Sequence, residues 1–118
     1  MIGAIIIGHG DLPVALADAL STITGPQEGI VAISNRALSM EELKKRIEGE
    51  VKKQKEVIVF TDLPGGSCTI ACHSLGIPVV SGVNLPMLLE FMVIREKMDI
   101  EGLVEKLAST GREGIKVL

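Results

Sequence analysis

The sequence predicts an α/β fold with a single doubly wound, mostly parallel sheet and helices on both of its faces. Short runs of β-branched residues alternate with segments of helical period along the chain, which is typical of successive βαβ units. The third of these runs is almost wholly apolar, as a central strand covered on both faces should be. A length of 118 residues with 47% hydrophobic residues suits one domain, residues 1–118, with a sizeable core.

The first half of the chain supplies two predicted strands and two predicted helices. The first strand spans residues 2–7, and Pro13 opens a helix that ends near residue 23, before a Gly-Pro stop signal. A second strand spans residues 30–33. Ser39 and Glu42 have the spacing of a capping box, which predicts the start of the next helix.

The second half continues the alternation. A strand over residues 57–61 leads through Gly65 and Gly66 into a short helix that runs to residue 75. A short fourth strand spans residues 78–81, and Pro86 opens a helix that runs to residue 94. We expect the sheet order 2-1-3-4, in which the order of the strands reverses between the first and the third.

The helix over residues 86–94 is apolar on all sides except at Glu90, so every side of it needs cover. A second subunit is the simplest cover, and a tightly wrapped core helix is the alternative. Asp99 then caps a last helix that Gly111 is expected to end, and residues 115–118 form a short final strand.

Composition and charge narrow the classes of function. The net charge is −3 and the chain has neither Trp nor Tyr, which argues against a nucleic-acid-binding protein. No segment reaches the ~20 apolar residues that cross a bilayer, and the N-terminus lacks a signal-peptide pattern, so we expect a cytoplasmic protein. Cys68 and Cys72 lie four residues apart in a predicted helix, where a disulfide between them is not expected.

His9 is the main candidate for chemistry. It follows the first strand directly and lies between Gly8 and Gly10, which leave the imidazole open to its surroundings. In the order 2-1-3-4 the first and third strands are neighbours, so their carboxyl ends bring His9 next to Asp62. A carboxylate there can fix the imidazole tautomer and leave the other ring nitrogen free to attack; a histidine that only fills the loop is the alternative.

An anion site is predicted beside this pair. Gly65 and Gly66 let the backbone approach a ligand, and the N–H groups of Gly66, Ser67 and Cys68 open a helix there. The helix that begins near Leu12 directs a second N-terminus to the same place. An ordinary strand-to-helix turn is the alternative explanation of the two glycines.

His73 and the two cysteines are weaker candidates. His73 lies inside a predicted helix without flanking glycines, as surface or core histidines commonly do. Adjacent residues on a helix point in different directions, so Cys72 and His73 do not make a good zinc site. We therefore expect neither a metal nor a cofactor.

With Gly8-His9-Gly10 at the end of the first strand and Asp62 followed by Gly65-Gly66-Ser67 after the third, the chain resembles the IIA component of the mannose family of the bacterial sugar phosphotransferase system. The resemblance runs almost end to end and is carried by four segments in order: Gly8-His9-Gly10, Thr61-Asp62 with Gly65-Gly66-Ser67, Gly82-Val83-Asn84-Leu85-Pro86-Met87-Leu88, and Thr110-Gly111-Arg112-Glu113-Gly114-Ile115-Lys116. The chain departs from the pattern at Leu63-Pro64 and at Cys68, Cys72 and His73. We expect no fused IIB domain.

The resemblance implies a phosphoryl relay. His9 would accept a phosphoryl group on Nε2 from the histidine phosphocarrier protein and pass it to a IIB component during sugar uptake, with the membrane IIC and IID components involved only indirectly. Asp62 would orient His9, Ser67 would contact the phosphoryl group, and Gly10, Gly65 and Gly66 would surround it. The resemblance also implies a homodimer in which residues 115–118 pair antiparallel with the partner's sheet.

Leu12, Leu63 and Pro64 form an apolar rim on which partner proteins could dock.

Two other interpretations of the sequence remain open: a regulatory binding module whose phosphorylation alters a partner, and an unrelated domain that binds a nucleotide or small anion. No P-loop or dinucleotide fingerprint favours the last of these. The sugar and the IIB partner stay open, because a IIA component does not contact sugar.

Overall fold

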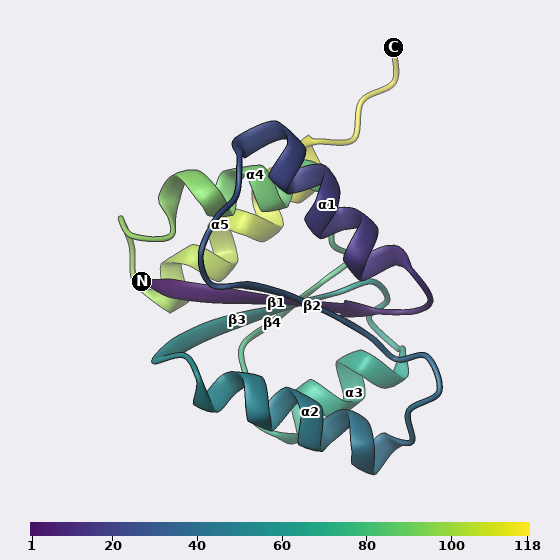
Figure 1. Cartoon of the computed structure of the whole chain (residues 1–118). Coiled ribbons are helices and arrows are strands. Elements are labelled where there is room, and N and C mark those ends of the chain that lie inside the picture. The colour runs from purple at the N-terminus through teal and green to yellow at the C-terminus, as the bar shows by residue number, and fades with distance from the viewer.

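Four parallel strands form one sheet in the order β2-β1-β3-β4, in a computed structural model that describes residues 1–118 (Figure 1). The strands are β1 (Ile2–Gly8), β2 (Ile30–Ser34), β3 (Glu56–Thr61) and β4 (Val79–Ser81). The predicted strand order is therefore confirmed. Because all strands run the same way, their carboxyl ends meet at one edge of the sheet, which is where sites form in open α/β sheets.

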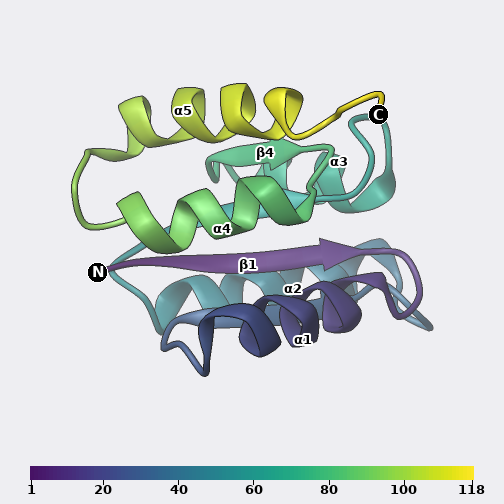
Figure 2. The same ribbon diagram turned by 90° about the horizontal axis from the view of Figure 1, so that it is seen from above.

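Five helices cover the two faces of the sheet (Figures 1 and 2). On one face lie α1 (Leu12–Thr24), α4 (Leu85–Ile94) and α5 (Ile100–Glu113), and on the other lie α2 (Met40–Lys52) and α3 (Ser67–Ser74). The longest of them has 14 residues, and none combines the length and the apolar character that crossing a bilayer requires.

The core is divided by the sheet into two apolar clusters. Along β1, Ala4 and Ile6 face α1, α4 and α5, whereas Ile5 and Ile7 face α2 and α3. Side chains that alternate between two covered faces explain why β1 is buried over its whole length. Phe60 from β3 meets Phe91 from α4 edge to face, with ring centroids 5.4 Å apart.

Polar side chains cap the N-termini of three of the helices. Ser39 and Glu42 form both bonds of the capping box at the start of α2, as predicted. Asp99 caps α5 by accepting from the N–H of Gly102, and Asn84 caps α4 by accepting from the N–H of Met87. These caps satisfy N–H groups that have no partner within the helix.

The prediction that Gly111 ends the last helix is wrong. α5 continues to Glu113, and Gly111 is buried inside it. A Cβ built on Gly111 would lie only 2.7 Å from Cε of Met87. Gly111 therefore serves the close approach of α5 to α4, and it does not act as a stop signal.

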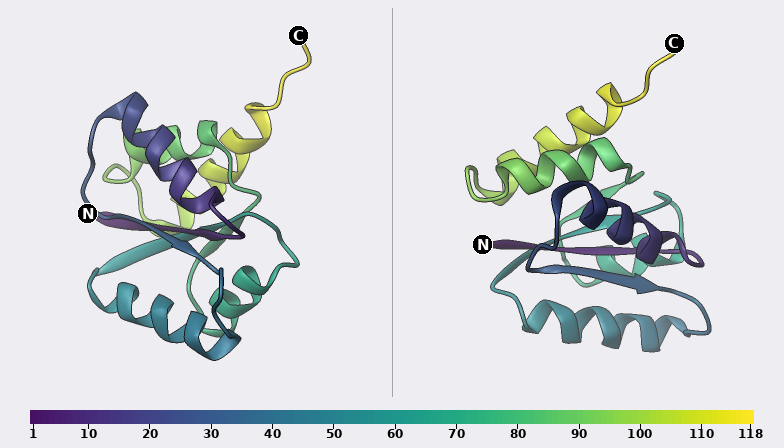
Figure 3. Two further views of the ribbon diagram at one scale, coloured as in Figure 1. Left: turned by 45° about the vertical axis from the view of Figure 1, so that its right-hand side comes forward. Right: turned by 45° about the horizontal axis from the view of Figure 1, so that its top comes forward.

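Residues 115–118 form no strand within the chain, contrary to our expectation of a short final strand. Figure 3 shows the segment leaving α5 and extending away from the body of the molecule. Ile115, Val117 and Leu118 are all strongly exposed. A strand needs a neighbour to bond, and within this chain the tail has none; its pairing with a second subunit stays a prediction.

Helix α4 is covered mostly by its own chain. Met87, Leu88 and Phe91 are buried, and α5 and α1 both pack against the helix. Only Val93 of its large apolar side chains is well exposed. The apolar character of α4 is thus largely explained by α1 and α5, without the second subunit that we inferred from it.

Candidate functional site

His9 stands where β1 ends. The strand is buried up to Gly8, and the His9 side chain is then 48% exposed. The chain turns sharply at once, because Gly10 has φ +59°, a backbone conformation that favours glycine. The imidazole of His9 is thus exposed at the carboxyl edge of the sheet, where other molecules can contact it.

Asp62 lies against this histidine, as the strand order predicts. β1 and β3 are parallel neighbours with Ile7 opposite Thr61, so the next residues of both strands emerge side by side. Oδ2 of Asp62 accepts from the backbone N–H of His9 at 2.9 Å, and Nδ1 of His9 lies 2.8 Å from the same oxygen. A carboxylate can only accept, so Nδ1 carries a proton and Nε2 keeps a free lone pair.

The Asp62 carboxyl is a charged acceptor in a nearly dry position. Its side chain is 10% exposed, and its Oδ1 is buried without a hydrogen-bond partner. Burial acts to raise the pKa of Asp62, but the backbone bond, the ring bond and the charge of His9 outweigh it, so the pKa lies below its ordinary value. The carboxylate therefore stays ionised at neutral pH, and His9 supplies both of its hydrogen bonds.

The two glycines after Asp62 have different surroundings. A Cβ built on Gly66 would lie 3.3 Å from Cε1 of His9, whereas one built on Gly65 would meet nothing within 4 Å. Gly66 thus lies directly against the imidazole, on the carbon next to Nε2. Ser67 follows as the first residue of α3, and its side chain is half-buried.

The N–H groups of this turn differ in part from our expectation. The N–H of Gly66 is already used, because it donates to the carbonyl of Leu63 at 3.2 Å. The N–H groups of Ser67, Cys68 and Thr69 have no backbone acceptor, as expected for the first turn of a helix. The anion-binding donors of α3 therefore begin at Ser67, one residue later than predicted.

Helix α1 offers fewer free donors than predicted. The N–H of Leu12 donates to the carbonyl of His9 at 3.3 Å, and Pro13 has no N–H. Asp11 precedes the helix, but its side chain makes no capping bond. The first turn of α1 thus leaves mainly the N–H of Val14 free.

A cluster of three hydroxyls beneath the site was not predicted from the sequence. The hydroxyl of buried Thr61 lies 2.7 Å from the hydroxyls of both Thr69 and Ser81. The Thr69 hydroxyl is also 2.5 Å from the carbonyl of Leu63. The cluster joins β3, β4 and α3 and so fixes the turn that carries Asp62 and Gly66. The only sequence signal was a threonine ending an apolar strand.

The cysteines and His73 lie apart from this chemistry. Cys68 and Cys72 are buried free thiols, and His73 is exposed on α3. Burial, and next the charge of Asp62, raise the pKa of Cys68; burial, and next Cys68, raise the pKa of Cys72 to about 12. Cys68, Cys72 and His73 do not come together as a metal-binding group.

Comparisons with known proteins agree on one family. Residues 3–108 match the family described as PTS system fructose IIA component. The chain is similar to the PTS system fructose-specific EIIA component of Bacillus subtilis (strain 168), with 28% identity over 126 residues, 99% of this chain and 86% of the relative.

Solved structures agree as well. The phosphotransferase system component EIIA from Streptococcus agalactiae has a TM-score of 0.94 and 33% identity, covering 99% of this chain and 97% of that one. The mannose/sorbose specific IIA subunit from Enterococcus faecalis shares the fold, with a TM-score of 0.80 and 18% identity, covering 98% and 93% of the two chains.

Proposed function

The chain belongs to the family of fructose IIA components of the sugar phosphotransferase system, and from this premise we propose that His9 is its phosphoryl carrier. His9 receives the group from the histidine phosphocarrier protein and passes it to a IIB component, which phosphorylates the incoming sugar. The membrane IIC and IID components are then reached only through IIB.

The contact between His9 and Asp62 is the observation that supports this proposal most. Asp62 occupies Nδ1 through Oδ2 at 2.8 Å, so Nε2 is the nitrogen that presents a lone pair to an incoming group. The same carboxylate also stabilises the positive charge that develops on the ring when the lone pair of Nε2 forms a bond to phosphorus. Orientation and charge are thus supplied by one buried residue.

The transfer is an in-line displacement. The lone pair of Nε2 forms a bond to phosphorus while the P–N bond of the carrier's phosphohistidine breaks, and its electron pair returns to the carrier's imidazole. Nδ1 keeps its proton and its bond to Asp62 throughout. Little covalent work is left to the protein, so positioning and electrostatics supply the catalysis. Passing the group to IIB is the reverse step with a new acceptor.

The turn into α3 provides the surroundings of the phosphoryl group. Ser67 presents both a hydroxyl and a free N–H, and the N–H groups of Cys68 and Thr69 lie next to it in the same helical turn. The positive end of a helix favours an anion at this position. Gly66 keeps a side chain out of the space beside the ring, where a Cβ would lie 3.3 Å from Cε1 of His9.

Partner proteins dock, in this proposal, on the apolar rim around His9. Leu12 and Leu63 are 44% and 56% exposed, and Pro64 is exposed beside them. These residues lie just after the two strands that carry His9 and Asp62. An apolar rim excludes water while two histidines approach each other, which strengthens the electrostatic contacts between them.

A homodimer is part of the proposal. Ile115 is 77% exposed, and Val117 and Leu118 are wholly exposed, so an apolar tail leaves the single chain without cover. Antiparallel pairing with the edge of a second sheet would bury it. Light scattering at micromolar concentration then gives twice the chain mass, and deletion of residues 115–118 gives a monomer. A monomeric full chain would contradict the dimer.

Phosphotransfer from the purified carrier protein tests the function. The wild-type protein takes up labelled phosphate that is stable in alkali and lost in acid, as a phosphohistidine is. His9→Ala removes the label, whereas His73→Ala, at the other and exposed histidine, retains it. Label on the His9→Ala protein would show that the assignment is wrong.

A further inference from the structure

The unphosphorylated site carries negative charge before the phosphoryl group arrives. Asp62 contacts the His9 ring, Asp11 follows Gly10 in the same loop, and a phosphoryl group adds about −1.5 to −2 charges at pH 7. Free N–H groups offset part of this charge. A cation at the rim would offset more of it.

Arg36 is a cation that the fold brings to this loop. It follows β2, the parallel neighbour of β1, and the N–H of Asn35 donates to the carbonyl of Gly8 just beyond the end of the paired strands. Nη1 of Arg36 donates to Oδ1 of Asp11 at 3.0 Å. Its other nitrogen, Nη2, lies 3.3 Å from where a Cβ on Gly10 would be. The guanidinium thus lies over the residue that follows His9.

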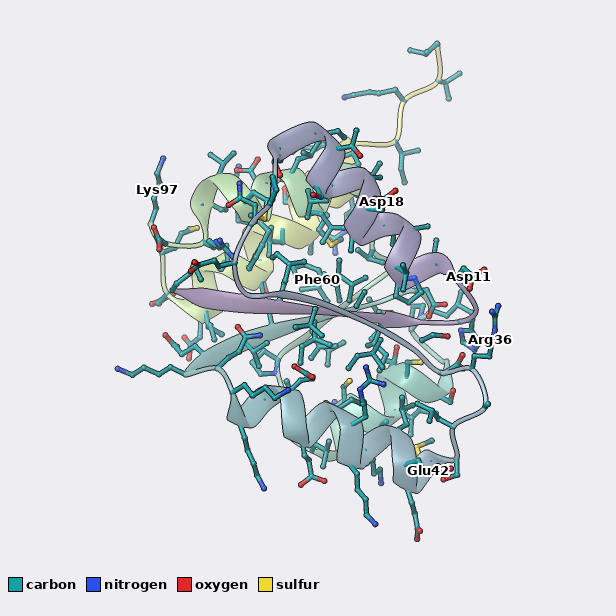
Figure 4. All side chains as sticks on the ribbon, in the orientation of Figure 1. Asp11, Asp18, Arg36, Glu42, Phe60 and Lys97 are labelled. Carbon is teal, nitrogen blue, oxygen red and sulfur yellow. The ribbon has the colours of Figure 1, made fainter.

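Figure 4 shows Arg36 and Asp11 together beyond the end of the sheet, at the edge where β1 ends. The backbone holds the arginine at this position. Its N–H donates to Oγ of Ser34 at 3.1 Å, and a turn closes around it through the N–H of Leu38 and the carbonyl of Asn35. Ala37 in this turn has φ +59°, the only positive φ of a residue other than glycine in the chain.

The present partner of Arg36 is easily exchanged. The side chains of Arg36 and Asp11 are 65% and 86% exposed, and ion pairs this exposed contribute little to stability. Asp11 does not use its carboxylate to cap α1, so the arginine is its only polar partner. A phosphoryl group offers more charge and three acceptor oxygens, which match the planar fork of a guanidinium.

We propose that Arg36 exchanges partners when His9 is phosphorylated, moving its guanidinium from Asp11 to the phosphoryl oxygens on Nε2. Arg36 is then a phosphoryl-contacting residue, and Asp11 is its resting partner. This inference rests on the proposed function, because it requires a phosphoryl group on His9. It goes beyond that function by assigning a residue of the β2 loop to the relay.

The test compares five proteins at low ionic strength: wild type, Arg36→Ala, Arg36→Lys, Asp11→Asn and Arg46→Ala. Arg46 is an exposed arginine on α2, so its removal changes the net charge equally and leaves the His9 loop intact. Each protein is mixed with labelled carrier protein until phosphoryl exchange reaches equilibrium. Each is also loaded with phosphoramidate, a small donor, and its phosphohistidine is observed by ³¹P NMR.

Arg36→Ala lowers the equilibrium constant for phosphorylation by about 3- to 10-fold, Arg36→Lys restores part of it, and Arg46→Ala matches the wild type. Asp11→Asn raises the constant, because it frees the arginine and removes a repelling charge. The effects shrink as salt is added, and Arg36→Ala alone shifts the ³¹P resonance. Arg36→Ala with the constant and the resonance of the wild type would overturn this inference. A wild type that no donor labels at His9 would instead overturn the proposed function.

Discussion

Substituting Asp62 by Asn tests the central contact of the site with almost no change of shape. In the wild type one carboxylate oxygen accepts both the backbone N–H and Nδ1–H of His9, at 2.9 and 2.8 Å. An amide is neutral, and it can turn its NH₂ group toward Nδ1. That arrangement favours the tautomer with the proton on Nε2, which has no lone pair for attack.

The expected loss of phosphotransfer rate follows from the hydrogen bond to a charged acceptor that Asp62→Asn removes. A hydrogen bond to a charged acceptor contributes about 1.5–3 kcal/mol, which corresponds to about 10- to 150-fold in rate. Asp→Asn in the Ser-His-Asp triads of hydrolases, at about 10⁴-fold, sets an upper bound. We therefore expect phosphotransfer to Asp62→Asn to be slower by at least about 10-fold, without loss of the fold.

Rapid-quench measurement of label transfer from the phosphorylated carrier gives this rate. Asp18→Asn is the matched control, because Asp18 is exposed on α1 and away from His9. Nitrogen NMR of the imidazole reports the tautomer directly, with Nδ1 protonated in the wild type and a mixture in Asp62→Asn. A folded Asp62→Asn protein that transfers at the wild-type rate would refute the role of Asp62.

Three more predictions concern the turn, the thiols and the core. Gly66→Ala slows phosphotransfer by about 3- to 10-fold, because the new Cβ would lie 3.3 Å from Cε1 of His9; Gly65→Ala, with nothing within 4 Å, keeps the wild-type rate, and equal rates for the two variants would contradict the argument. Cys72, with a pKa of about 12, holds only about one thiolate per 10⁴ thiols at pH 8, so iodoacetamide labels it after unfolding but hardly in the native protein. Phe91→Ala lowers the free energy of unfolding in urea by about 3–5 kcal/mol, because Phe91 is fully buried against Phe60; a loss below 1 kcal/mol would show that the core there collapses freely.

The sheet and the central pair of the site were predictable because they depend on strand order. Apolar runs gave the strands, and the order 2-1-3-4 makes the ends of β1 and β3 neighbours, so His9 and Asp62 had to emerge side by side. The capping box of Ser39 and Glu42 was equally local, since both of its bonds lie within four residues.

The features that could not be predicted depend on contacts between distant segments. Whether Gly66 has a free N–H depends on how tightly the turn folds back to Leu63, which composition does not encode. Gly111 has the look of a helix stop, yet it serves the packing of α5 on Met87, a residue 24 positions earlier. The hydroxyl cluster around Thr61 joins three elements, so no local pattern indicates it.

The distribution of exposure in the site favours a relay over the turnover of an enclosed metabolite. His9 is 48% exposed, whereas Asp62, which orients it, is 10% exposed. A nucleophile that must meet the histidine of one protein and then a group on another has to stand clear of the surface. The carboxylate that fixes its tautomer has to stay dry, because water would weaken the contact. The sheet satisfies both requirements, because β1 leads into the exposed imidazole of His9 and its neighbour β3 leads into the buried carboxylate of Asp62.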